Sequence, residues 1–192
     1  DTLYGASYLL LGQQGPVVLT VPPIPGRYFS VALLDAYFNN FAILSPRTVG
    51  NEGGAWLLVP PGWEGEVPAG VRGVLHATTP SVCLLQRIFT HGPEEYATLH
   101  QLQDAIRLAP LDRWLAGQGG FPLIDLAEYA VPGMRMVRDP LQYFAYTNAY
   151  TGRNQPPAAD AGLAALFGTA GAGPGAPVPE DAAAQEAIRQ GA

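Results

Sequence analysis

The longest apolar run in the chain, Gly26–Thr48, also contains its densest group of large polar side chains. Read with a period of two, one face of this run mixes apolar residues with four polar ones: Arg27, Asp35, Tyr37 and Asn39. The opposite face is rich in aromatic and branched side chains, and no helical stripe emerges. The pattern therefore predicts a central β-strand that is covered on both faces.

Shorter apolar runs, separated by glycine and proline, predict more strands around this one. They are expected at residues 2–11, 16–21, 55–59, 70–78 and 81–89. The first two are predicted to join through a tight turn at Gly12–Gly15. Strands spaced about ten residues apart with such punctuation indicate an antiparallel meander or sandwich.

After Gly92 the hydrophobic period changes from that of a strand to that of a helix. Pro93 suits a first helical position, and the two acidic residues that follow it complement the helix dipole. A helix is therefore expected at residues 93–108, with an inward stripe formed by Tyr96, Leu99, Leu102 and Ile106.

The rest of the chain is poor in strand signals. Residues 112–139 have no steady period and are expected to form irregular surface chain. Asp139 is expected to cap a helix that starts at Pro140. Two more short helices are expected at residues 156–168 and 180–189. A Gly/Pro/Ala linker at residues 171–179 is expected to join them.

Together these elements predict an α+β fold: a mostly antiparallel, sandwich-like β unit with one packed helix and a helical C-terminal tail. We expect a β-rich domain at residues 1–138, which includes the helix at 93–108, and a helical, Gly/Pro-rich tail at 139–192. The chain has no initiator methionine and opens inside patterned sequence, so it is interpreted as a fragment.

Composition excludes some classes of function. The net charge of −6 and the isoelectric point near 4.9 leave no basic surface for nucleic acid. All ten basic residues are arginine, which is typical of GC-rich bacterial genomes. No apolar run approaches the ~20 residues of a membrane span. Cys83 is the single cysteine, so no internal disulfide can form, and its apolar neighbours predict a buried, inert thiol rather than a nucleophile.

The polar residues of the central run support two interpretations. In the first, Asp35 pairs with a buried arginine and holds the register of the sheet. In the second, Asp35 and Tyr37 are catalytic candidates, because a carboxylate beside a phenol can act as a general acid or base. The ligand-binding set of the second interpretation is Arg27, Asp35, Tyr37, Asn39 and Arg47, which favours a small anion or a polyhydroxylated ligand.

A glycosidase would need a second carboxylate opposite Asp35, and the sequence leaves open whether it is Asp1, Glu52 or Asp104. The three histidines have no spacing typical of metal ligands: His76, His91 and His100. We therefore expect neither a metal site nor a cofactor.

Several segments together resemble a bacterial family known as domain of unknown function 1254. The matching segments lie in order along the chain: Asp1–Tyr4, Val17–Pro22, Gly26–Ser30, Leu34–Tyr37 with Asn39, Arg47–Thr48, Pro61–Trp63, Leu102–Asp104, Leu108–Leu111, Asn154–Asp160 and Pro174–Gly175. One departure is Phe38, which stands where the family usually has threonine.

The resemblance implies a largely antiparallel β domain with helices, usually followed by a second β-rich domain that these residues do not include. That second domain is the expected partner, and many members are predicted to be exported. The sequence itself does not distinguish a periplasmic or exported protein from a cytoplasmic one. No catalytic role is established for the family.

Two functions follow as hypotheses. The first is a non-catalytic structural module of a larger two-domain envelope protein, or one that binds a polar ligand such as carbohydrate. The alternative is half of a hydrolase- or lyase-type enzyme whose site is completed by the second domain. Full burial and pairing of Asp35 and Arg27 would favour the first.

Overall fold

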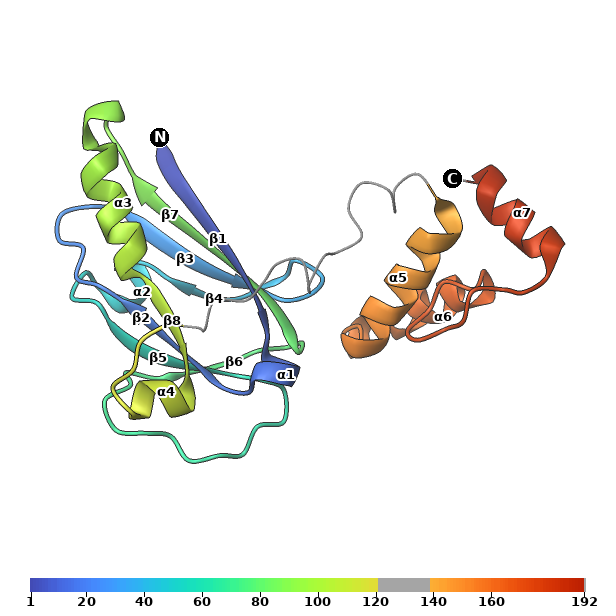
Figure 1. Cartoon of the computed structure of the whole chain (residues 1–192), viewed down its shortest axis with the longest axis horizontal. Helices are drawn as coiled ribbons and strands as arrows, with labels where there is room; N and C mark the ends of the chain where they lie inside the picture. Colours follow the sequence, from blue (N-terminus) through green and yellow to red (C-terminus); the bar gives the residue numbers. More distant parts are fainter. Residues whose placement is uncertain (121–138, 192) are drawn as a thin grey trace. The chain divides into compact units, whose positions relative to one another are not determined.

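The computed structural model describes residues 1–120 and 139–191. The chain forms two compact units, Asp1–Pro122 and Leu123–Ala192, coloured along the sequence in Figure 1. Within the described residues, every strand belongs to the first unit. Each unit is therefore described separately.

Four antiparallel strands form the first sheet, in the order β1-β7-β3-β4. Their bounds are β1 Thr2–Leu10, β7 Ser81–Phe89, β3 Phe29–Leu34 and β4 Asn40–Leu44. β1 and β7 pair over their full length, from Thr2 opposite Phe89 to Leu10 opposite Ser81. β3 is an inner strand, bonded to β7 on one side and to β4 on the other.

The second sheet has the order β6-β5-β2-β8. Its strands are β6 Val74–His76, β5 Gly54–Val59, β2 Val17–Val21 and β8 Arg107–Pro110. β5 and β6 are parallel, whereas β2 pairs with β5 and β8 in antiparallel fashion. The mostly antiparallel α+β fold expected from the sequence is therefore confirmed.

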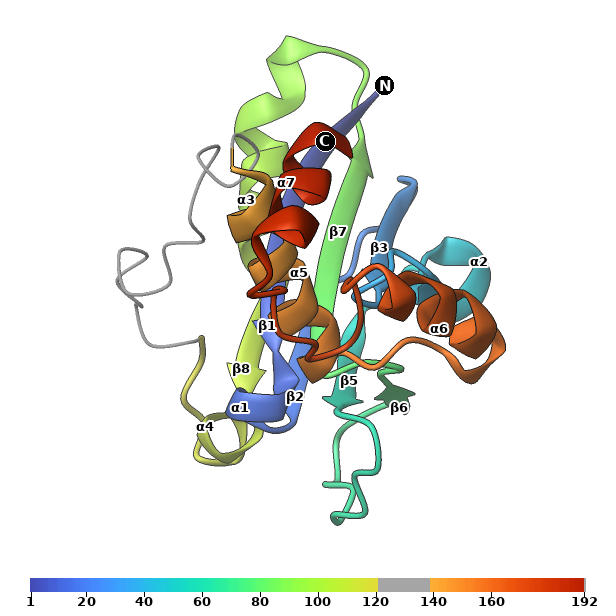
Figure 2. The same ribbon diagram turned by 90° about the vertical axis from the view of Figure 1, so that its right-hand side faces the viewer.

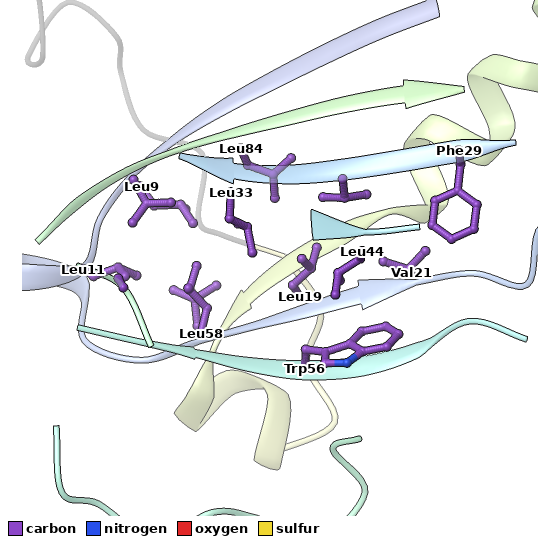
Figure 3. Packing of buried hydrophobic residues seen from close by; sticks show 14 of the residues in the cluster. Leu9, Leu11, Leu19, Val21, Phe29, Leu33, Leu44, Trp56, Leu58 and Leu84 are labelled. Carbon is purple, nitrogen blue, oxygen red and sulfur yellow. The ribbon is translucent and has the colours of Figure 1, made fainter. Parts of the chain in front are cut away.

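The core lies between the two sheets. Figure 3 shows Leu33 and Leu84 of the first sheet facing Leu19 and Leu58 of the second, with Phe29 farther along the same layer. Burying each such side chain contributes about 1.5–3 kcal/mol relative to exposure. This contribution holds the two sheets together as a sandwich.

The outer side of the second sheet is covered as well. Helix α4 (Leu111–Leu115) and the connection between β5 and β6 lie on this side, as Figure 2 also shows. Their side chains Trp63 and Trp114 pack against Val18 and Leu57 of the sheet. The second sheet is thus buried on both faces.

The helix expected at residues 93–108 is shorter than predicted. A 3-10 turn, Pro93–Glu95, leads into α3 (Tyr96–Ala105), and residues 107–110 form strand β8 instead. Leu99 is fully buried in the core, but Tyr96 is exposed, so the expected inward stripe is correct only in part. Tertiary pairing with β2 therefore prevails over helical periodicity after Ala105.

The prediction of one long central strand is wrong. β3 ends at Leu34, residues 35–39 form a turn, and β4 begins at Asn40. In this hairpin Phe38 N donates to Asp35 O at 3.0 Å, and Asp35 N donates to Asn39 O at 3.0 Å. The polar residues of the run therefore lie at the two ends of β3 and not along one face.

The turn carries local backbone strain. Phe38 adopts a φ of 61°, the left-handed conformation that glycine normally supplies in a hairpin of this kind. The register then shifts between Leu33 and Leu34, so that Phe41 is an extra residue of β4 that packs against the core.

Three smaller predictions also differ from the structure. The expected turn at residues 12–15 is the short helix α1 (Leu11–Gln14), and the expected strand at 70–78 is reduced to β6. α4 occupies part of the segment 112–139 that was expected to be irregular. The rest of that segment, residues 121–138, lies outside the described residues. One more short helix, α2 (Pro46–Val49), follows β4.

The second unit is helical, as predicted. Its elements are α5 Pro140–Arg153, a 3-10 turn Ala158–Asp160, α6 Ala161–Thr169 and α7 Ala182–Gly191. Asp139 caps α5 as expected, because Leu141 N donates to Asp139 Oδ1 at 3.1 Å.

The linker expected at residues 171–179 is held against α5 by one buried amide. Asn148 Nδ2 donates to Gly171 O at 2.8 Å and to Ala176 O at 2.9 Å. In return, Gly173 N donates to Asn148 Oδ1 at 3.1 Å, and Gly175 N donates to Asn148 O at 2.7 Å. These bonds fix the first half of the linker along the helix.

We predict that Phe38→Gly raises the free energy of unfolding by about 1 kcal/mol, because the left-handed conformation costs a residue with a side chain about 1–2 kcal/mol. Phe38 is 65% exposed, so little packing is lost. Urea denaturation measures the change. Ala36→Gly in the same turn is the matched control and should destabilise by about 0.5–1 kcal/mol. If Phe38→Gly is no more stable than the parent, the backbone of Phe38 is not strained.

Candidate functional site

The five residues expected to form one site lie in two separate places. Arg27 precedes β3 and Asp35 follows it, so the whole strand separates them. At about 3.3 Å per residue, this separation is on the order of 25 Å. Arg47, on α2 after β4, lies at the Arg27 end, because β4 runs antiparallel to β3. The Arg–Asp pair proposed from the sequence is therefore wrong.

Asp35 is 3% exposed and its carboxylate accepts four hydrogen bonds. Oδ1 accepts from Tyr37 N at 2.8 Å and from Asn39 N at 2.9 Å. Oδ2 accepts from Asn39 Nδ2 at 3.2 Å and from Thr78 Oγ1 at 3.1 Å. A buried carboxylate is costly unless it is satisfied in this way. The hairpin turn and the β6–β7 connection supply all its donors.

A second bond joins the same two segments. Ala36 N donates to Thr79 Oγ1 at 2.9 Å, and Thr79 Oγ1 donates to Ser81 O at 2.7 Å. Thr78 and Thr79 stand between β6 of the second sheet and β7 of the first. The turn after β3 is thus tied to the chain that crosses between the sheets.

Tyr37 and Asn39 stabilise this turn through their main-chain amides, and the Asn39 carboxamide also donates to Asp35. Tyr37 is half-buried, whereas Asn39 and Arg47 are exposed. The structure therefore brings three of the five candidates together: Asp35, Tyr37 and Asn39. Arg27 and Arg47 belong to the other end of β3.

Arg27 forms a bidentate ion pair with Glu95. Nη1 donates to Glu95 Oε2 at 2.8 Å and Nη2 donates to Oε1 at 2.9 Å, while Nη1 also donates to Phe89 O at 2.6 Å. Glu95 further accepts from His91 N at 3.0 Å, and His91 Nδ1 lies 3.2 Å from Oε1. This group joins the start of β3 to the turn that leads into α3.

This contact shifts the pKa values of both Arg27 and Glu95. The hydrogen bonds from Arg27, and then the one from His91 N, hold the pKa of the Glu95 carboxyl well below its ordinary value. The bond to Glu95 also raises the pKa of Arg27. Because Glu95 is 25% and Arg27 22% exposed, solvent weakens the pair, and its role is mainly geometric.

Two partners were not identified from the sequence. The sequence pattern indicates only a helix-dipole role for Glu95 and predicts Thr78 inside a strand. Nothing local in the sequence links either residue to β3, because their partners are 68 and 43 positions away. A motif search at short spacing could not have found these contacts.

The candidate second carboxylates are not among the hydrogen-bonding partners of Asp35. Asp1 pairs with the end of β7 through its main chain, since Thr90 N donates to Asp1 O at 3.0 Å. Glu52 follows Asn51, whose side chain bonds to Arg27 O at 3.2 Å. Asp104 is exposed on α3. The contacts of these described residues therefore place Asp1 and Glu52 at the Arg27 end of β3 and not beside Asp35.

His91 and His100 contact different residues. His91 bonds to Glu95 and packs edge-on against Phe89, while His100 bonds to Gln103 at 3.0 Å. Within the described ranges, no three His, Cys, Asp or Glu side chains gather in a way that could hold a metal ion. Cys83 is buried, as predicted.

The second unit contains a hollow of about 830 Å³ next to α5 and α7. Its lining is mostly apolar and includes Pro140, Tyr143, Phe144, Pro179 and Ile188. Among the described lining residues none is charged, and the polar side chains are the Tyr143 phenol and the Thr169 hydroxyl. Separately, none of the helices in the described part of the chain is long and apolar enough to cross a membrane.

We predict that Asp35→Ala lowers the free energy of unfolding by about 2–4 kcal/mol, because it leaves buried donors without an acceptor. A double variant that adds Arg27→Met tests whether Asp35 instead stabilises the fold by pairing with Arg27. Sites this far apart should be additive within about 0.5 kcal/mol. Urea denaturation of the parent, both single variants and the double variant completes the cycle. A coupling energy well above that value would restore the rejected pair.

A second prediction concerns pH. Because folding lowers the pKa of Glu95, its contribution to stability is complete above the unfolded value of about 4.3 and is lost as the pH falls below it. Glu95→Gln should therefore reduce the urea midpoint near neutral pH but flatten its decline in acid. Glu94→Gln, at the exposed neighbouring position, is the control and should leave the decline unchanged. Equal acid sensitivity of Glu95→Gln and the parent would refute this assignment.

Comparisons with known proteins agree with this description of the fold. A family model, described as "Protein of unknown function (DUF1254)", matches residues 1–110. None of the curated proteins matches the chain. A solved structure, the VPA0106 protein from Vibrio parahaemolyticus, is similar with a TM-score of 0.72 and 24% identity. The match covers 99% of this chain but only 45% of that one. With more than half of its length matched by the family model, the chain belongs to the DUF1254 family.

Proposed function

We propose that the first unit is a non-catalytic structural module of a longer bacterial protein. In this proposal the polar residues near β3 stabilise the fold and do not bind a substrate. The longer protein is part of the proposal because the chain spans less than half of the solved relative.

The observation that carries the proposal is the Asp35 carboxylate. It is almost fully buried and accepts four hydrogen bonds from the chain itself, so both oxygens are occupied. A general acid or base must reach the proton that it transfers. Using Asp35 in that way would first break the turn that it organises.

The arginine expected to bind an anion is engaged in a similar way. Arg27 gives its planar donor pair to Glu95 and a further bond to Phe89 O. A carbohydrate site would need free, convergent polar groups beside an aromatic ring. Of the remaining candidates, Arg47 lies at the opposite end of the hairpin strands from Tyr37 and Asn39. The geometry thus favours neither the carbohydrate-binding version nor half of a hydrolase or lyase.

We predict that a calorimetric screen of sugars and small carboxylates against the chain gives no saturable binding near β3. Asp35→Asn and Arg27→Gln serve as variants, because each removes the charge but keeps a polar side chain. Circular dichroism and a melting curve establish that both variants are folded. A ligand that binds the parent and is lost in both folded variants would overturn the structural role and revive a pocket.

A further inference from the structure

The outward side of the first sheet carries three rows of side chains that we name the tyrosine face. Strand register places Tyr4, Arg87 and Ser30 in one row, Ala6, Leu85, Ala32 and Ile43 in the next, and Tyr8, Cys83, Leu34 and Asn40 in the third. The intervening residues of these strands point into the core, so the named ones point away from it.

This face is apolar for a surface that meets water. Tyr4 is 60% exposed, Tyr8 70% and Ile43 44%. Both hydrophobic clusters of the described residues in the first unit lie elsewhere, between the sheets and on the outer side of the second sheet. The two sheets of the first unit therefore differ: α4 and the β5–β6 connection cover the outer side of the second sheet, whereas neither hydrophobic cluster of the described residues of that unit includes the outer side of the first.

Arg87 is the single charged residue of the tyrosine face. Its guanidinium lies over the Tyr4 ring, 5.1 Å from the ring centre. Among the described residues it forms no ion pair, and its buried Nε has no hydrogen-bond partner. An unpaired donor in apolar surroundings requires an acceptor, and a carboxylate suits the arginine fork best.

The charge of this face argues against a second copy as its occupant. Two copies joined through the same face would bury two arginines in one interface, and the face carries no acid to neutralise them. The occupant must therefore supply a carboxylate that the tyrosine face itself lacks.

The area of the face argues for a segment of the same protein. Four strands about 4.8 Å apart, over the roughly 20 Å of length that three rows occupy, give on the order of 400 Å². A stable complex between separate chains needs about 800 Å² per partner. Contacts between domains of one chain are smaller, at about 300–750 Å² per side.

We propose that the tyrosine face docks a further segment of the longer protein, one with an apolar surface and a carboxylate that pairs with Arg87. The inference rests on the proposed structural function, to which it adds a docking surface and the chemistry of its partner. The apolar side chains of the segment cover Ala6, Ala32 and Leu85, and its acid meets the guanidinium beside Tyr4.

The test uses the longer natural protein with a photo-crosslinking phenylalanine analogue in place of Tyr4. After irradiation and proteolysis, mass spectrometry identifies the linked peptide. The expected peptide lies outside residues 1–192, within the same polypeptide, and contains an Asp or Glu among apolar residues. The same analogue at Tyr96, on α3, is the matched control and should not give that peptide.

Substitution supplies an independent measurement. In the longer protein, Arg87→Glu should lower the melting temperature by several degrees, and Arg87→Met by less, because methionine keeps the apolar stem without the charge. Arg107→Glu, at an exposed position of β8, should have little effect. In the 192-residue chain alone, Arg87→Glu should lower the melting temperature by less than in the longer protein, because only the contact with the Tyr4 ring is then lost.

Several outcomes would overturn the inference. These are a crosslink to a second copy, to a separate protein or to a peptide within residues 1–192, and equal effects of Arg87→Glu with and without the additional chain. Recovery of the natural protein at no more than this length would also overturn it. The ligand screen near β3 is a separate experiment, so either proposal can fail while the other stands.

Discussion

The buried carboxylate of Asp35 is the constraint on which the candidate site depends. An unsatisfied charge at 3% exposure would be strongly destabilising, so the chain around it must supply donors. It does so with two main-chain amides, a carboxamide and a hydroxyl. Meeting that requirement sets the shape of the β3–β4 turn and ties it to the β6–β7 connection. Four accepted bonds match the roughly four lone-pair sites of a carboxylate.

The opposite end of β3 is fixed by a different kind of contact. Arg27 and Glu95 join two segments that are 68 positions apart, and His91 completes the set of donors to the carboxylate. About a quarter of each side chain is exposed, so solvent weakens the pair, and it acts mainly through the fork geometry that positions the start of α3. Both ends of the central strand are therefore held by polar contacts, each satisfied within the chain.

The sequence was sufficient to predict the α+β class, the antiparallel sandwich and the Asp139 cap, because these depend on local periodicity and capping chemistry. It was not sufficient for the turn at residues 35–39. That turn has no glycine or proline, and Phe38 occupies the left-handed position, so the segment resembled continuous strand. The pairing of Arg27 with Glu95 also could not be predicted, because a contact across the fold has no periodic signature in the chain.

The prediction that the central strand is apolar on both faces agrees with the structure of β3. An antiparallel sheet with one face in water usually alternates apolar and polar residues, yet β3 is apolar toward both faces except at Ser30. Its outward residues Ala32 and Leu34 lie in the rows of the tyrosine face. The second sheet has the same two-sided apolar character, and there α4 and the β5–β6 connection cover the outer side. The composition of the first sheet therefore suits a surface that polypeptide covers, and Arg87 limits that polypeptide to one that brings an acid.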